Sequence, residues 1–124
     1  MARVRIAWDG GEVTANLRDT PTVKKLLAVL PCAASANTWG EEIYFEVPLV
    51  SPLEADARQV VDPGTVCYWV DGKSLALPFG RTPISKGSES RLVTACNVLG
   101  KVDGDLRPLH SVSAGARIRV ELVT

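Results

Sequence analysis

The chain has 124 residues and a mass of 13.3 kDa, which fits one domain spanning residues 1–124. Its 14 Lys and Arg balance its 14 Asp and Glu, so the net charge favours neither a nucleic-acid partner nor an anionic membrane. Hydrophobic residues make up 46% of the chain and charged residues 23%, which is typical of a folded protein and excludes a disordered one.

Arg3 and Arg5 interrupt the first apolar run, so no signal-peptide core forms there. The longest uncharged apolar stretch, residues 26–34, is far shorter than the ~20 residues of a membrane helix. His110 is the only histidine, and the cysteines are odd in number and widely spaced: Cys32, Cys67 and Cys96. We therefore expect buried thiols in a reducing cytoplasm, with no metal site and no cofactor.

The N-terminal quarter predicts a hairpin and a helix. Apolar residues alternate with polar ones over residues 3–8 and again over 13–17, and Asp9-Gly10-Gly11 between them predicts a tight turn. Thr20-Pro21 then has the chemistry of a helix start, and Pro31 ends the helix. The helix has one apolar stripe, formed by Val23, Leu26, Leu27 and Leu30.

The middle of the chain is less uniform. Residues 33–40 form a polar connector, and residues 42–47 alternate as a half-buried strand. Ser51 and Glu54 have the spacing of a capping box, which favours a short helix over residues 53–61; an extended segment is the competing prediction.

The C-terminal half predicts mainly strands. They cover residues 65–70, 75–79, 92–102 and 117–123, with a long loop over 80–91 and a helical turn near Leu106 within the loop 104–115. The chain is thus mainly β, with seven or eight strands arranged as a barrel or sandwich. Because the first and last strands share the same arginine–apolar alternation, we expect them to pair.

Several segments together resemble one family. They are Asn-Thr-Trp-Gly-Glu-Glu-Ile-Tyr-Phe at 37–45, Pro-Gly at 63–64 with Tyr-Trp at 68–69, Phe-Gly-Arg-Thr-Pro at 79–83 and Val-Leu-Gly-Lys-Val at 98–102. On these motifs the chain is similar, over nearly its whole length, to the small stand-alone cyclophilin-like proteins of bacteria and archaea, which have no established activity. The resemblance implies a closed, roughly eight-stranded β-barrel with one clear helix and one or two short helical segments.

True cyclophilins isomerise the bond before proline, using an arginine in a Phe-His-Arg run. The matching strand here carries Glu41, Glu42, Tyr44 and Glu46 instead, with no arginine or histidine. A carboxylate accepts hydrogen bonds where a guanidinium donates them, so prolyl isomerisation by that mechanism is not expected.

The cyclophilin groove lies on the outer face of the barrel. If Ile43 and Phe45 point inward, Glu42 and Tyr44 face that groove. Trp39 is either a pocket wall or a plug of the barrel end, and either Tyr68 or Trp69 lies in the core. The candidate ligand-binding residues are Asn37, Thr38, Trp39, Glu42, Tyr44, Phe79 and Arg81.

Two hypotheses of function follow. In the first, the groove binds a small molecule or short peptide, with Glu42 selecting an amine or amide donor. In the second, the protein is an enzyme with Glu42 as general acid or base and Tyr44 as its partner. An atypical prolyl isomerase is a weaker third alternative, and the sequence leaves the oligomeric state open.

Overall fold

The computed structural model describes residues 2–123, which form ten strands, one α-helix and one 3-10 helix. The strands are β1 (Ala2–Trp8), β2 (Gly11–Leu17), β3 (Cys32–Ser35), β4 (Asn37–Thr38), β5 (Glu42–Glu46), β6 (Arg58–Val61), β7 (Thr65–Trp69), β8 (Ser74–Pro78), β9 (Ser90–Asp103) and β10 (Arg117–Val123). The helices are α1 (Pro21–Val29) and the 3-10 helix η1 (Arg107–Ser111), which takes up the helical turn expected near Leu106. No helix in this range is long and apolar enough to cross a membrane.

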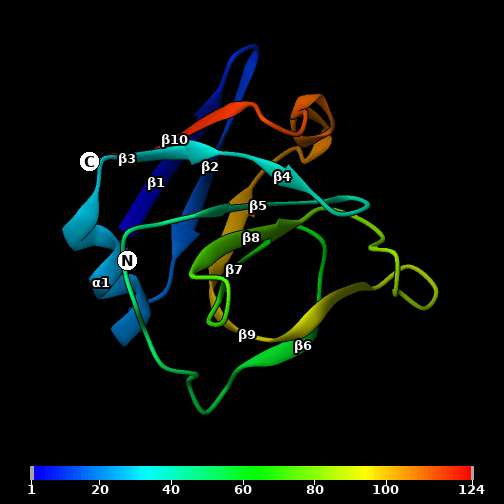
Figure 1. Ribbon diagram of the computed structural model, residues 1–124, viewed down its shortest axis with the longest axis horizontal. Helices are drawn as coiled ribbons and strands as arrows, with labels where there is room; N and C mark the ends of the chain where they lie inside the picture. Colours follow the sequence, from blue (N-terminus) through cyan, green and yellow to red (C-terminus); the bar gives the residue numbers. More distant parts are fainter. Residues whose placement is uncertain (1, 124) are drawn as a thin grey trace.

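The strands form a curved antiparallel sheet in the order β3-β10-β1-β2-β9-β7-β8-β5-β4, with β6 beside β9 (Figure 1). The predicted pairing of the first and last strands is confirmed, since Ile6 of β1 lies opposite Val120 of β10. The hairpin turn before β2 is also confirmed, and Gly10 there has a φ of +96°.

The expected closed, eight-stranded barrel is wrong in two respects. The sheet has more strands, and within residues 2–123 no hydrogen-bonded pairing joins its two ends, β3 and β4. These ends are consecutive segments of one stretch, divided at Ala36, where the sequence had predicted only a polar connector. The N–H of Ala36 donates to the carbonyl of Ala116, just before β10 (2.8 Å). The next residue, Asn37, pairs instead with Tyr44 of β5. The chain itself, rather than a ladder of hydrogen bonds, therefore connects the two edges.

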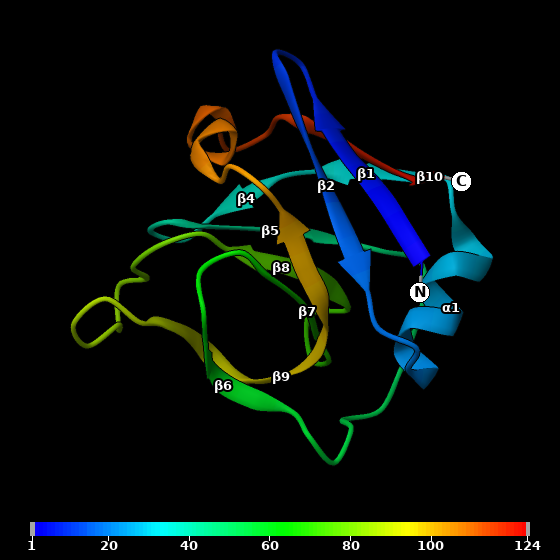
Figure 2. The same ribbon diagram turned by 180° about the vertical axis from the view of Figure 1, so that it is seen from behind.

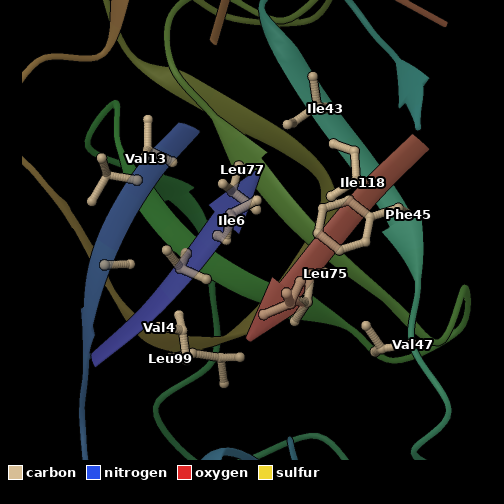
Figure 3. Packing of buried hydrophobic residues seen from close by; sticks show 14 of the residues in the cluster. Val4, Ile6, Val13, Ile43, Phe45, Val47, Leu75, Leu77, Leu99 and Ile118 are labelled. Carbon is tan, nitrogen blue, oxygen red and sulfur yellow. The ribbon is translucent and has the colours of Figure 1, made fainter. Parts of the chain in front are cut away.

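The main core fills the inside of the curved sheet (Figure 3). Ile43, Phe45 and Val47 point into it, as the alternation predicts. On the neighbouring strand β8, Leu77 lies opposite Ile43 and Leu75 opposite Phe45. The opposite face of β5, which carries Glu42 and Tyr44, is therefore turned away from this core.

The short helix expected over residues 53–61 is wrong, and the extended alternative is right for residues 58–61, which form β6. The carboxylate of Glu54 does not cap a helix of its own; its Oε2 accepts the backbone N–H of Thr22 in the first turn of α1 (3.1 Å). The backbone N–H of Glu54 is held by Asn97 Oδ1 (2.7 Å). Long-range partners thus override the local capping signal.

Strand β9 is long enough to pair with strands of two different sheets. Its second half pairs with β7 and β2 in the main sheet, whereas its first half leaves the sheet and pairs with β6. In Figures 1 and 2 this β6–β9 ribbon lies below β7 and β8. A small second apolar cluster lies between the ribbon and the outer face of the sheet, made of Val61, Cys67, Ala76, Leu92 and Cys96.

Candidate functional site

A pocket opens where the β6–β9 ribbon meets the outer face of β5, β7 and β8. Its cavity volume is about 130 Å³, close to the ~150 Å³ of a protein cavity that binds benzene. Most of its lining is apolar or aromatic: Trp39, Glu42, Tyr44, Trp69, Ala76, Leu92, Val93 and Cys96. Concave apolar pockets with one or two polar groups are the usual form of a small-molecule site.

Glu42 is the one carboxylic acid in the pocket lining. It lies at the start of β5 on the face opposite the core, yet its exposed fraction is only 6%. The residues that line the pocket with it are mostly apolar or aromatic. Burial raises its pKa from 4.5 to about 7, since the charged form loses its hydration. Its Oε1 is buried and has no hydrogen-bond partner among the described residues.

Trp69 supplies the other buried, unpaired polar atom. Its indole N–H finds no acceptor within residues 2–123, although the ring lines the same pocket as Glu42. The ring packs edge-to-face with Tyr44, with centroids 5.8 Å apart. A side chain on Gly72 would place its Cβ 2.2 Å from the indole ring, so the turn between β7 and β8 needs glycine there. Tyr68, on the other face of β7, is the core residue of this pair and donates its hydroxyl to the Leu49 carbonyl (2.9 Å).

Trp39 is a wall of the pocket, which answers the choice left open by the sequence. The turn that follows it is tight: the Trp39 N–H donates to the Glu42 carbonyl (2.9 Å), and Gly40 has a φ of +59°. A Cβ on Gly40 would lie 2.9 Å from the Arg81 carbonyl oxygen. Glycine therefore permits both the conformation and the close approach that set the position of Trp39.

Cys96 also lines the pocket, and Cys67 belongs to the apolar cluster beneath it. Burial and the nearby Glu42 raise the pKa of the Cys96 thiol to about 12, and burial raises that of Cys67 as well. Thiols so hard to ionise are poor nucleophiles and poor metal ligands. No group of three or more histidine, cysteine, aspartate or glutamate side chains in the described chain is arranged to hold a metal ion.

Of the candidate binding residues, the structure brings together Trp39, Glu42 and Tyr44, and the other four do not line the pocket. Asn37 and Thr38 are exposed on β4, and Asn37 Nδ2 donates to the Tyr44 carbonyl (3.4 Å). Phe79 packs against the main core, and exposed Arg81 donates to the Ser85 carbonyl (3.2 Å).

A second polar contact lies beside Phe79. The ring of His110, from η1, meets Phe79 edge-on with centroids 4.7 Å apart, and His110 Nε2 lies 3.6 Å from Glu41 Oε2. Glu41 also accepts the Arg81 N–H (3.1 Å). Because both members of the Glu41–His110 pair are about half exposed, this contact resembles an ordinary surface ion pair.

Sequence reasoning missed the far wall of the pocket. That wall comprises Ala76, Leu92, Val93 and Cys96, together with Trp69, for which the sequence leaves open whether it or Tyr68 lies in the core. The alternation with core Tyr68 does indicate that Trp69 faces outward. Nothing in the residue pattern of 90–96 indicates that this half of β9 leaves the sheet and covers the outer face.

These features define a mainly β, cyclophilin-like fold with a pocket on the outer face of the sheet. The chain belongs to the Cyclophilin-like family, whose sequence model matches residues 2–121. It is similar to a hypothetical protein of Archaeoglobus fulgidus with a known solution structure: identity is 35%, the TM-score is 0.85, and the match covers 98% of this chain and 95% of the other. No protein with a curated description matches the sequence.

Proposed function

We propose that this protein binds a small organic molecule in the outer-face pocket. Glu42 is its polar anchor, and Trp39 and Tyr44 are apolar walls. The observation that carries the proposal is that Glu42 and Trp69, which line the same pocket, each have a buried polar atom without a partner among the described residues, Oε1 and Nε1 respectively. Buried polar groups without partners are rare in folded proteins, because each costs about 1–3 kcal/mol. A ligand that pairs with them would recover that free energy on binding.

The cavity size favours a small molecule over a peptide. About 130 Å³ accommodates a group the size of benzene, so a peptide would insert no more than one side chain or terminal group. Asn37, Thr38, Phe79 and Arg81 lie outside this pocket and are not part of the proposed site.

The test is a thermal-shift screen of a metabolite library, followed by affinity measurements on each hit. Glu42→Gln should weaken binding by about tenfold, because a charge-assisted hydrogen bond becomes a neutral one. The matched control is Glu46→Gln, which lies on the same strand and is exposed. Equal affinity of both variants for every hit, or no hit at all, would contradict the proposed site.

The raised pKa of Glu42 favours enzymatic activity as a second candidate function. A carboxyl group with a pKa of about 7 can both donate and accept a proton near neutral pH, and Tyr44 lines the same pocket. Proton NMR of a hit incubated with the protein separates the two functions: a bound ligand stays unchanged, whereas a substrate is converted, and Glu42→Gln should stop the conversion. Prolyl isomerisation gains no support, since the pocket lining includes no arginine among the described residues.

A cytoplasmic location belongs to the same proposal. It is supported by Cys32, Cys67 and Cys96, all of which are free thiols in the fold. Proteins of reducing compartments commonly keep such thiols, whereas secreted proteins tend to use theirs as disulfides.

A further inference from the structure

The two unpaired atoms of the pocket have opposite hydrogen-bonding character. The indole N–H of Trp69 can only donate, and an ionised Glu42 carboxylate can only accept. A ligand that satisfies both must therefore offer an acceptor and a donor within a cavity of about 130 Å³. The need for both a donor and an acceptor restricts the possible ligands more than the apolar walls of the pocket do.

The charges in the pocket lining restrict the chemical class of the ligand further. Its lining, within the described part of the chain, contains no lysine, arginine or histidine, so an anionic ligand would face Glu42 with no counter-charge. An ammonium group would pair with Glu42, but it has no acceptor for the Trp69 N–H and loses its hydration in apolar surroundings. A neutral ligand avoids both penalties.

We propose, building on the function inferred above, that the pocket selects small uncharged amides, namely a primary carboxamide or a small lactam. The amide N–H donates to Glu42 Oε1, and the amide carbonyl accepts the Trp69 N–H. The aliphatic part of the ligand packs against Leu92, Val93 and Ala76, which form the apolar wall. A primary amide or lactam presents its N–H and C=O on one edge, whereas a trans peptide bond directs them apart and brings in two flanking residues. Trp69 is thus the specificity-determining residue.

Three probes with the same branched skeleton test this selection: isobutyramide, isobutylamine and isobutyrate, titrated into ¹⁵N-labelled protein at slightly alkaline pH, where Glu42 is ionised. The readout is the set of indole N–H resonances. Those of Trp39 and Trp69 report on the pocket, and Trp8 is an internal control because its N–H is already donated to Ser111 Oγ (2.9 Å).

Isobutyramide should shift the two pocket resonances with saturation, leave Trp8 in place, and bind at least about tenfold more tightly than either charged probe, the equivalent of one hydrogen bond. Trp69→Phe keeps an aromatic ring and removes the N–H; the Trp39 resonance should then report at least about threefold weaker isobutyramide binding. An unchanged Trp8 resonance checks that this variant folds.

Tighter binding of isobutylamine or isobutyrate would overturn the amide class and leave the proposed pocket function standing. The amide class is equally overturned if none of the three probes moves the pocket resonances while the metabolite screen yields a hit that depends on Glu42. If the screen also yields nothing, the proposed function itself fails.

Discussion

At the scale of single residues, the site depends on a carboxyl group in an unfavourable place. Glu42 is buried with one oxygen unpaired and no cationic residue beside it in the pocket lining of the described chain. Such an arrangement reduces stability, and proteins tend to retain it where the group has a functional role. The raised pKa of Glu42 makes this reduction measurable, because it links protonation to folding.

The sign of that linkage is fixed by the direction of the shift. Below about pH 4.5 the carboxyl is protonated in both the folded and the unfolded chain, so Glu42 has no effect on the pH dependence. Between about pH 4.5 and 7 only the unfolded chain releases the proton, and stability falls by about 3 kcal/mol; above that range the loss stays constant.

Glu42→Gln should remove this loss. Urea unfolding at acidic and at slightly alkaline pH should show the stability of the variant, relative to wild type, rising by about 3 kcal/mol between the two conditions. Any fixed penalty of burying the Gln amide cancels in that difference. Glu46→Gln, which changes an exposed carboxyl on the same strand and keeps Glu42, should retain this fall in stability. A parallel profile for Glu42→Gln and wild type would show that the carboxyl is well hydrated.

At the scale of elements, the turn between β4 and β5 positions Trp39. Gly40 has a positive φ and lies close to the segment 81–83. Any other residue at this position would therefore be destabilised twice, by its backbone conformation and by a steric clash. Gly87 is a matched control: its φ is +64°, but a Cβ there would meet nothing within 4 Å.

Gly40→Ala should therefore destabilise the protein more than Gly87→Ala does. Each variant loses about 1–2 kcal/mol from left-handed backbone strain, and only Gly40→Ala adds a clash with the Arg81 carbonyl oxygen. Urea unfolding measures the stabilities, and the indole resonance of Trp39 should move in Gly40→Ala alone. Equal stabilities and an unmoved Trp39 resonance would mean that the turn does not position the pocket wall.

At the scale of the whole molecule, local patterns predict most of the elements and only part of their assembly. The hairpin at Asp9-Gly10, the helix from Pro21 and the inward face of β5 follow from turn chemistry and periodicity. The division of one stretch at Ala36 between β10 and β5, and the departure of β9 towards β6, depend on partners far away in the sequence. The same difference divides the pocket. Glu42 and Tyr44 are predictable because the alternation along their strand places them on the outer face. Leu92 and Cys96 are not, because they reach the pocket only where β9 leaves the main sheet towards β6.

The central claim is that the outer-face pocket holds Glu42 in apolar surroundings, with one buried carboxyl oxygen that has no hydrogen-bond partner among the described residues. An NMR titration of ¹³C-labelled glutamate side chains tests it directly. We predict a pKa of about 7 for Glu42. A value near 4.5, the ordinary pKa of a glutamate side chain, would mean that water reaches the carboxyl freely, and it would contradict the account of the pocket.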